Sequence, residues 1–299
     1  MTDMLESLGL SPPQISILKA FAGELSRIPG VVAVVLGGSF ARRTARPDSD
    51  IDVGFYYSEN APPEIEAVRR CAEQISASHI PPTVSKYYGW GPWVNGGAWI
   101  QTQSGKLDLL YRNIEQVQRL LDESQQGIYH HDYYQQPTFG FVSVIYLAEI
   151  KCCVPLFDPQ NLLQRFKQNI ESYPPALQDK LVEDCLTCAE FTLIHAHSFA
   201  DRGDLLNTLG CLTKIGFVLS QTLFALNAEY YFGDKGSLES LDQLANKPQN
   251  FSRQLRQGLG MQLQDRQDLQ SATVNMQRLW KQVVAIAGNR YTPKFGLNG

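Results

Sequence analysis

The sequence of 299 residues is long enough for one large domain or two ordinary ones, each with its own hydrophobic core. Hydrophobic residues make up 43% and charged residues 19%, as in ordinary globular proteins, and a net charge of −4 excludes an overall positive field that would attract nucleic acid or an anionic membrane. An acidic, proline-containing start and the lack of eighteen uninterrupted apolar residues predict neither a signal peptide nor a membrane span, so we expect a cytoplasmic protein.

The first part of the chain mixes predicted helices and strands, identified by hydrophobic periods of three to four residues or by β-branched runs. The expected elements are a helix at 13–27, a buried strand at 31–38, a strand at 51–57, a helix at 63–78, a hairpin of strands at 98–103 and 106–112, and a helix at 113–124.

The second part of the chain is almost entirely helical in pattern. We expect an inter-domain connection at 125–137 and helices near 139–152, 160–170, 176–201, 203–228, 238–246 and 265–288. This order predicts an α+β fold, with an α+β domain at 1–125 followed by an all-α helical-bundle domain at 126–299.

Six cysteines are present, and Cys185 and Cys188 form a CxxC pair. The pair lies within a helical, one-sided apolar pattern, and no second CxxC or His pair stands at zinc-site spacing. The cysteines are therefore interpreted as small buried hydrophobic residues in a reducing compartment.

Two acids in the segment GGSFARRTARPDSDIDV, residues 37–53, suggest a metal site. Asp50 and Asp52 alternate with Ile51 and Val53, so in a strand both carboxylates project from one face while the apolar side chains enter the core. Two adjacent carboxylates repel each other and need a cation, and their oxygen ligands suit Mg²⁺.

A third acid, Asp108, interrupts the apolar strand KLDLLYR in the same way. With Leu107 and Leu109 in the core, Asp108 faces the polar side. If its strand neighbours the strand at 51–57, three carboxylates converge and can hold two Mg²⁺ about 4 Å apart, the arrangement that serves phosphoryl transfer.

The same segment carries a predicted phosphate site. Gly37 and Gly38 follow a buried strand, where glycine lets phosphate approach the backbone N–H groups, and the Ser39 hydroxyl adds a donor. The positive charge that would balance a triphosphate comes from Arg42, Arg43 and Arg46. The phosphate site therefore precedes the metal site by about a dozen residues.

Each feature alone has a plainer explanation. A GGS segment is more often only a turn, three arginines can be a solvated face, and Asp108 can cap a turn or pair with a lysine. A calcium loop is excluded because Val53 occupies the position of the required glycine, and Asp48 after Pro47 is interpreted as a turn residue. Their occurrence together, in this order, favours binding of an NTP with Mg²⁺.

The pattern GGSxxRxxxRxDSDIDV with a later acid on a strand resembles the nucleotidyltransferase signature of the DNA polymerase β superfamily, over residues 31–112. More loosely, GGAWIQTQSGKLDLLYR and ALNAEYYFGDKG resemble stand-alone bacterial nucleotidyltransferases with a C-terminal helical domain, some similar to aminoglycoside nucleotidyltransferases.

The resemblance implies a small mixed sheet with helices on one side in the first domain, and a helical second domain that binds substrate or acts as a lid. It also implies two Mg²⁺ ions, an NTP substrate with ATP favoured, and attack of an acceptor hydroxyl on the α-phosphate with loss of pyrophosphate. Both metals would be ligated by Asp50 and Asp52, and Asp108 would ligate the catalytic metal and help to activate the acceptor. Phosphates would lie on Gly38 and Ser39. Glu149 is an alternative base, although a surface or capping role is at least as common.

Aromatic and basic residues outside the motif are secondary candidates. Tyr230 and Lys235 lie in NAEYYFGDKG, where a tyrosine could stack on the base and the lysine reach phosphate; ordinary packing at a helix end is the alternative. The tryptophans of WGPWVNGGAW could line an acceptor pocket or simply cover the sheet.

Three hypotheses follow. The leading one is transfer of NMP, with AMP favoured, to a hydroxylated small molecule. The second is an AMP-adding, antitoxin-like enzyme that modifies a protein side chain, and the third is a non-catalytic nucleotide-binding module. All three acids are present, which argues against the module, and the lack of an extended basic face argues against a nucleic-acid acceptor. The sequence leaves the acceptor and the choice between a monomer and a homodimer open.

Overall fold

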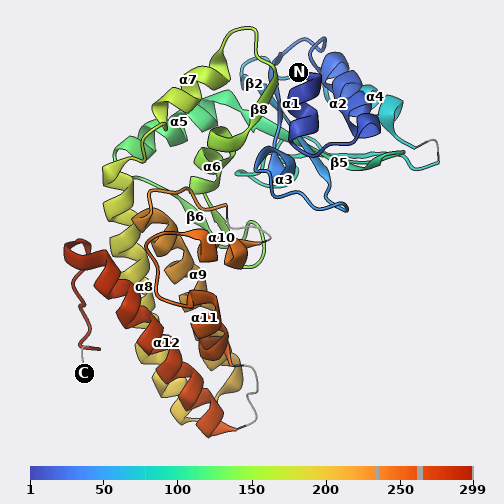
Figure 1. Cartoon of the computed structure of the whole chain (residues 1–299). Coiled ribbons are helices and arrows are strands. Elements are labelled where there is room, and N and C mark those ends of the chain that lie inside the picture. The colour runs from blue at the N-terminus through green and yellow to red at the C-terminus, as the bar shows by residue number, and fades with distance from the viewer. Residues whose placement is uncertain (78, 233–235, 261–264, 298–299) are drawn as a thin grey trace. The chain divides into compact units, whose positions relative to one another are not determined.

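The computed structural model describes residues 1–77, 79–232, 236–260 and 265–297 (Figure 1). The chain forms two compact units: Met1–Asp122 with His131–Glu171, and Glu123–His130 with Ser172–Gly299. This division differs from the boundary predicted between residues 125 and 126, because residues 131–171 pack with the N-terminal part of the chain.

A six-stranded mixed sheet is the centre of the first unit, with strand order β3-β4-β5-β2-β1-β8. Its strands are β1 (Val31–Leu36), β2 (Ile51–Tyr57), β3 (Thr83–Val84), β4 (Gly97–Thr102), β5 (Gly105–Asn113) and β8 (Val154–Phe157). Only β2 and β5 pair in parallel among these strands. The strands predicted from alternation are confirmed, whereas the edge strand β8 was not predicted, because a four-residue run containing Pro155 reads as a loop.

The helices of the first unit are α1 (Thr2–Ser7), α2 (Pro12–Leu25), α3 (Gly38–Ala41), α4 (Ile65–Ile75), α5 (Ile114–Gln125, whose last turn enters the second unit), α6 (Val144–Cys152) and α7 (Leu162–Asn169). Ser11 begins α2 through a capping box with Gln14, which satisfies backbone N–H groups left open at a helix start. The helix predicted at 139–152 starts only at Val144, because β7 (Phe141–Val142) pairs with β6 (His131–Asp132).

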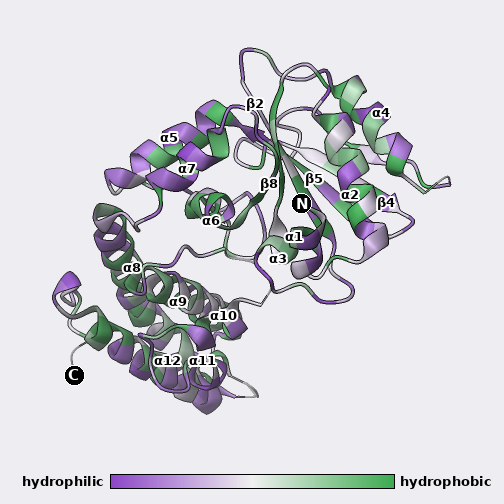
Figure 2. Cartoon of the chain, turned by 45° about the horizontal axis from the view of Figure 1, so that its top comes forward, coloured by the Kyte–Doolittle hydropathy of each residue, from purple (hydrophilic) through white to green (hydrophobic). Residues whose placement is uncertain are grey.

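The two faces of the sheet differ in character because side chains alternate along each strand. On one face Ile51, Val53 and Phe55 are buried in a hydrophobic cluster with α2 and α4, which Figure 2 shows together on one side of the strands. Burying such a side chain fully contributes about 1.5–3 kcal/mol. Asp52 and Tyr56 therefore point to the opposite face, which carries the polar residues of interest.

The second unit is helical: α8 (Pro175–Asp201), α9 (Leu205–Leu226), α10 (Ser237–Gln243), α11 (Phe251–Leu259), α12 (Arg266–Ala287) and the 3₁₀ turn Gly288–Arg290. The Asp204 side chain caps α9 by accepting the N–H of Asn207. Among the described residues α9 is the one helix long and apolar enough to cross a membrane, but 61% of its apolar window is buried within the protein, as in a core helix. The predicted α+β fold class, a small mixed sheet followed by a helical region, is confirmed. The expectation of helices on one side of the sheet is not met, because α6 and α7 contact Arg112 and Tyr56 on the face opposite to α2 and α4.

Candidate active site

Two of the predicted acids stand side by side on the polar face of the sheet. Asp52 of β2 is the direct register partner of Asp108 of β5, and parallel neighbours of this kind lie about 4.8 Å apart along the hydrogen-bonding direction. Both acids are half-buried, while the flanking Ile51, Val53, Leu107 and Leu109 are fully buried. The structure thus brings together Asp52 and Asp108, as the sequence analysis expected on condition that their strands are neighbours.

Asp50 lies two residues before Asp52 in the chain. It is half-buried and precedes β2, which begins at Ile51. Within 1–77, 79–232, 236–260 and 265–297, no three His, Cys, Asp or Glu side chains gather closely enough to hold a metal by themselves. Of the three carboxylates predicted to converge, the structure places two, Asp52 and Asp108, side by side.

The glycines of the motif adjoin Asp52 directly. The N–H of Gly37 donates to the backbone carbonyl of Asp52 at 2.8 Å. Gly38 has a positive φ of 59°, and a Cβ added there would stand 1.7 Å from Oδ2 of Asp52. Only glycine fits between the strand end and this carboxylate. The predicted phosphate turn and the predicted metal ligand therefore occupy one place in the molecule.

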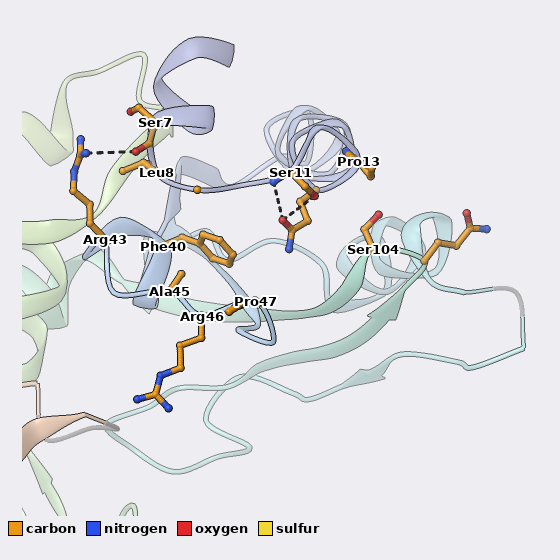
Figure 3. A pocket seen from close by; sticks show the side chains of 13 residues that line it. Ser7, Leu8, Ser11, Pro13, Phe40, Arg43, Ala45, Arg46, Pro47 and Ser104 are labelled. Atoms are coloured by element: carbon orange, nitrogen blue, oxygen red, sulfur yellow. Dashed lines mark hydrogen bonds between the residues drawn. The ribbon is translucent and has the colours of Figure 1, made fainter. Parts of the chain in front are cut away.

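Two arginines of the motif, Arg43 and Arg46, line a neighbouring pocket whose lining does not include the acids. Arg42 is half-buried, and its charge acts on the thiol of Cys152 in α6. Arg43 donates to the carbonyl of Ser7 at 3.4 Å, and Arg46 is exposed and points away from Arg43 (Figure 3). Binding of phosphate by Arg42 and Arg46 stays a prediction.

A pocket of about 840 Å³ lies beside the motif and not over the acids. Arg43 and Arg46 line it together with Phe40, the start of the chain and the turn between β4 and β5 (Figure 3). None of Asp50, Asp52 and Asp108 is among its lining residues. The chemistry suggested by the acids therefore belongs to the open sheet face and not to this pocket.

The donor set at Asp52 and Asp108 fits Mg²⁺. This ion binds oxygen ligands and usually takes one or two carboxylates from the protein, with waters and substrate phosphates completing its shell. A pair of carboxylates next to the glycine turn predicted to bind phosphate would provide this combination. The residues present therefore suit a divalent cation that arrives with a nucleotide better than a cation held by protein alone.

Glu149 has a different partner from the one expected of a base. Its two carboxylate oxygens accept hydrogen bonds from Nε and Nη2 of Arg112 in β5, each at 2.8 Å. Burial by itself would lower the pKa of Arg112, but Glu149, aided by Tyr146 and Tyr56, raises it above its ordinary value. The interpretation of Glu149 as an alternative base stays a prediction, and its bidentate pairing with Arg112 weighs against it.

The secondary candidates of the helical unit are Tyr230 and Lys235. Tyr230 is buried and stacks on Tyr173 at 4.6 Å between ring centroids, in agreement with ordinary packing. Lys235 lies outside the described residues. All six cysteines are free, and burial raises the pKa of Cys152 to about 12 and that of Cys153 to about 11, so these thiols stay protonated at neutral pH.

One feature of the site escaped the sequence analysis. In the antiparallel pair β4–β5, Trp99 is the register partner of Asp108, so Asp52, Asp108 and Trp99 form a row across three neighbouring strands on one face. The signal was available in principle, because a two-residue turn between Thr102 and Gly105 fixes the register of the hairpin. The predicted turn lies one residue later, at 104–105, and that register does not pair Trp99 with Asp108.

Comparison with known families agrees with this geometry. Residues 18–87 match the model of the nucleotidyltransferase domain family. The chain carries a nucleotidyltransferase domain. The predicted polymerase β-type resemblance and enzyme class are thereby confirmed. The match includes Gly37, Gly38, Asp50 and Asp52, whereas Asp108 lies beyond its end.

Two solved structures are similar to this nucleotidyltransferase at low identity. The first is a nucleotidyltransferase-like protein from Exiguobacterium sibiricum 255-15, at 9% identity and a TM-score of 0.45, covering 90% of this chain and 75% of the other. The second is an aminoglycoside 6-adenyltransferase from Bacillus subtilis, at 12% identity and a TM-score of 0.34, covering 95% and 94%. No curated protein matches the sequence.

Proposed function

We propose that this nucleotidyltransferase moves a nucleoside monophosphate, with AMP favoured, from an NTP with Mg²⁺ onto a hydroxyl of a small molecule, releasing pyrophosphate. The observation that carries the proposal is the register pair Asp52–Asp108 with Gly38 pressed against the Asp52 carboxylate. Hard oxygen ligands and a phosphate-admitting turn meet there, as NTP-dependent transfer requires.

In the proposed reaction, the backbone at Gly38 and the hydroxyl of Ser39 hold the β- and γ-phosphates, while the N–H of Gly37, which the sequence analysis also assigned to phosphate, donates to the carbonyl of Asp52 and fixes the turn. Asp52 and Asp108 are the carboxylates that would hold the cations, together with Asp50, which directly precedes β2. Bound Mg²⁺ supplies positive charge that stabilises the attacking and leaving oxygens.

The bond changes are simple. Asp108 helps to remove the proton of the acceptor hydroxyl while that oxygen forms a bond to the α-phosphorus. The bond from the α-phosphorus to the oxygen bridging to the β-phosphate breaks, and pyrophosphate leaves with the electron pair. The product is the acceptor joined to NMP by a phosphodiester.

A cytoplasmic reaction is part of the proposal. Six free cysteines, several of them buried, suit a reducing compartment, where ATP and Mg²⁺ are plentiful.

The direct test is pyrophosphate release from each of the four NTPs with Mg²⁺, with purified saccharides, aminoglycosides, a protein-free cell extract and the protein fraction of the same extract as separate acceptor pools. We expect one NTP to be preferred, a small-molecule pool to stimulate release, and Asp52→Asn to abolish the stimulation. Stimulation only by a protein fraction would instead identify a protein-modifying enzyme. Mg²⁺-dependent NTP binding without turnover in any pool would leave a binding module, and the proposed reaction would be wrong.

A further inference from the structure

A pair of tryptophans occupies the acid-bearing face next to Asp108. Trp99, the register partner of Asp108 in β4, is 55% exposed. The indole of Trp90 stacks on it, with 4.8 Å between ring centroids and 22° between the ring planes. Directly opposite residues of antiparallel strands have Cβ atoms about 5 Å apart, so the exposed indole begins within one side-chain length of the Asp108 carboxylate.

Gly97 of β4 leaves the space that the Trp90 indole occupies. Gly97 lies two residues before Trp99, on the same face of the sheet. A Cβ at Gly97 would stand 2.8 Å from Cζ3 of Trp90 and 1.9 Å from the carbonyl oxygen of Leu109. Any larger residue at position 97 would lift Trp90 off the sheet and break the stack.

The loop that presents Trp90 is held by side chains from three other segments. The Gln135 amide donates to the carbonyl of Trp90 at 2.6 Å and accepts the N–H of Trp93 at 2.9 Å. The Tyr146 hydroxyl of α6 donates to the carbonyl of Trp93, and Gln116 of α5 donates to that of Pro92 at 2.9 Å. So many side chains holding one loop backbone indicate that the position of Trp90 matters.

The backbone of the same loop adopts conformations that are costly for ordinary residues. Tyr88 and Asn95 have positive φ angles of 59° and 64°, and Asn95 is completely buried with its side chain bonded to Gln116 at 3.0 Å. Left-handed backbone at residues other than glycine costs about 1–3 kcal/mol and gathers at binding sites. The fold thus holds an exposed aromatic surface rigidly beside the acids.

The order of strands separates two sides of the acid pair. Gly37 and Gly38 follow β1, which borders β2 on one side; Trp99 lies in β4, which borders β5 on the other. Across the sheet the sequence of features is therefore phosphate turn, Asp52, Asp108 and aromatic surface. With the NTP phosphates on the first side, the attacking hydroxyl must come from the other.

We propose that Trp99, supported by Trp90, is the surface on which the acceptor binds, and that the acceptor is a hydroxylated ring of the saccharide or cyclitol class. The inference rests on the proposed function. A flat face of C–H groups stacks on the indole, and the ring hydroxyls at its edge reach Asp108. Gln135 is a positioning residue that keeps Trp90 under Trp99.

The test uses the full-length enzyme and a defined panel of neutral and amino-substituted mono-, di- and trisaccharides, with pyrophosphate release as the readout. At least one panel member should stimulate release by the wild type. For that acceptor Trp99→Leu should raise the KM about tenfold or more, as loss of one stacking contact does, with kcat changed less than about threefold. The KM for the NTP should stay unchanged, and Trp99→Phe should recover most of the loss.

Controls separate this inference from the proposed function. Tyr134→Leu removes a fully exposed aromatic side chain of the same unit and should leave both KM values unchanged. Gln135→Leu should raise the acceptor KM less than Trp99→Leu does and reduce the circular dichroism of the stacked indoles. Calorimetry of NTP with Mg²⁺ shows whether each variant is folded and competent.

Two results would overturn the assignment of Trp99 while the proposed function stands: an unchanged acceptor KM in Trp99→Leu, or a raised KM for the NTP, which would place the nucleobase on the indole. Nucleotide transfer to acceptors outside the panel, with no stimulation by any saccharide, would refute the substrate class. Failure of the wild type to bind any NTP would refute the proposed function itself.

Discussion

The two ends of one sheet face use the same pair of strands in opposite ways. At the open end Asp52 and Asp108 stand in register, half-buried, against a glycine turn. At the other end of the same face, four residues further along both strands, Tyr56 and Arg112 are register partners, and both are buried. There Glu149 of α6 neutralises Arg112 through two hydrogen bonds, and Phe166 of α7 packs near Tyr56.

The comparison shows how one scaffold separates stability from chemistry. The covered end pairs its charge inside the protein, where a matched ion pair with all its hydrogen bonds is tolerated. The open end places two like charges side by side, an arrangement that costs free energy unless a cation lies between them. We therefore expect mutations at the open end to change activity with little effect on folding, and mutations at the covered end to do the reverse.

The largest expected effect is at Asp52. Asp52→Asn removes a charge from the open end without changing the shape of the side chain, and we expect nucleotidyl transfer to fall by about 10³-fold or more, as when one charged group is removed from a transition-state site. Steady-state pyrophosphate release measures the loss. The matched control is Asp48→Asn in the exposed turn of the same motif, which should retain nearly full activity; equal losses in both variants would contradict the separation.

A smaller loss of activity is expected at Gly38. Gly38→Ala puts a methyl group where the Asp52 carboxylate lies and strains a backbone with φ of 59°, so we expect transfer to fall by about 10²-fold because the catalytic geometry shifts. Gly23→Ala in α2 is the control, since its Cβ would meet nothing within 4 Å. Full activity in Gly38→Ala would show that the turn and Asp52 are not coupled as the structure indicates.

At the covered end the expected effect is on stability. Arg112→Met leaves Glu149 without its guanidinium partner, and we expect the free energy of unfolding to fall by about 3 kcal/mol, a value at the lower end of the range for broken buried pairs because Glu149 is partly exposed. Denaturant unfolding followed by circular dichroism measures it. Arg69→Met, which breaks the exposed pair with Glu66, should cost less than about 1 kcal/mol.

A double-mutant cycle sharpens this prediction. Arg112→Met with Glu149→Gln should be more stable than Arg112→Met alone, because the unpaired carboxylate is gone. The specific activity per folded molecule should stay within about threefold of wild type in Arg112→Met and in the double variant. A loss of activity of about 10³-fold in Glu149→Gln, in a folded protein, would instead support Glu149 as a base.

The smallest effect is expected in the helical unit, and it depends on pH. The buried Glu190 carboxylate accepts the Tyr291 hydroxyl and the N–H groups of Lys294 and Phe295, which lowers its pKa below the ordinary value although burial opposes this. A lowered pKa in the folded state means stability that is present above about pH 4.3 and is lost as the pH falls.

Glu190→Gln should therefore cost about 1–2 kcal/mol at pH 7, with the difference from wild type shrinking at pH values below about 4. Thermal unfolding at a series of pH values, combined with hydrogen exchange over α8, provides the measurement. A difference that grows as the pH falls would have the wrong sign and would contradict the assigned hydrogen bonds. Nucleotide binding should be unaffected at pH 7.

Much of this arrangement could be predicted from the sequence, because it depends on alternation within strands. The pattern of Asp52 with Ile51 and Val53, and of Asp108 with its leucines, is local and fixes which side chains face the core. Which strands become neighbours is not local. The parallel pairing of β2 with β5 was only a condition in the sequence argument, and the structure supplied it.

Other features were out of reach for a similar reason. Residues 131–171 join the first unit through contacts with distant segments, such as Gln135 with Trp93 and Glu149 with Arg112, and these leave no periodic signal. The directions of Arg43 and Arg46 depend on a loop with left-handed backbone at Arg43, which a sequence pattern does not specify. Long-range side-chain bonds and loop conformations were therefore the missing part.

The central claim is that Asp52 and Asp108 form a cation-dependent nucleotide site. Calorimetric titration of ATP into wild type and Asp52→Asn, each with Mg²⁺ and with EDTA in its place, tests it most directly. The account predicts binding by the wild type with Mg²⁺, and at least tenfold weaker binding both in EDTA and in the folded Asp52→Asn variant. Equal binding under all four conditions would contradict it, because the acid pair would then have no part in holding the nucleotide.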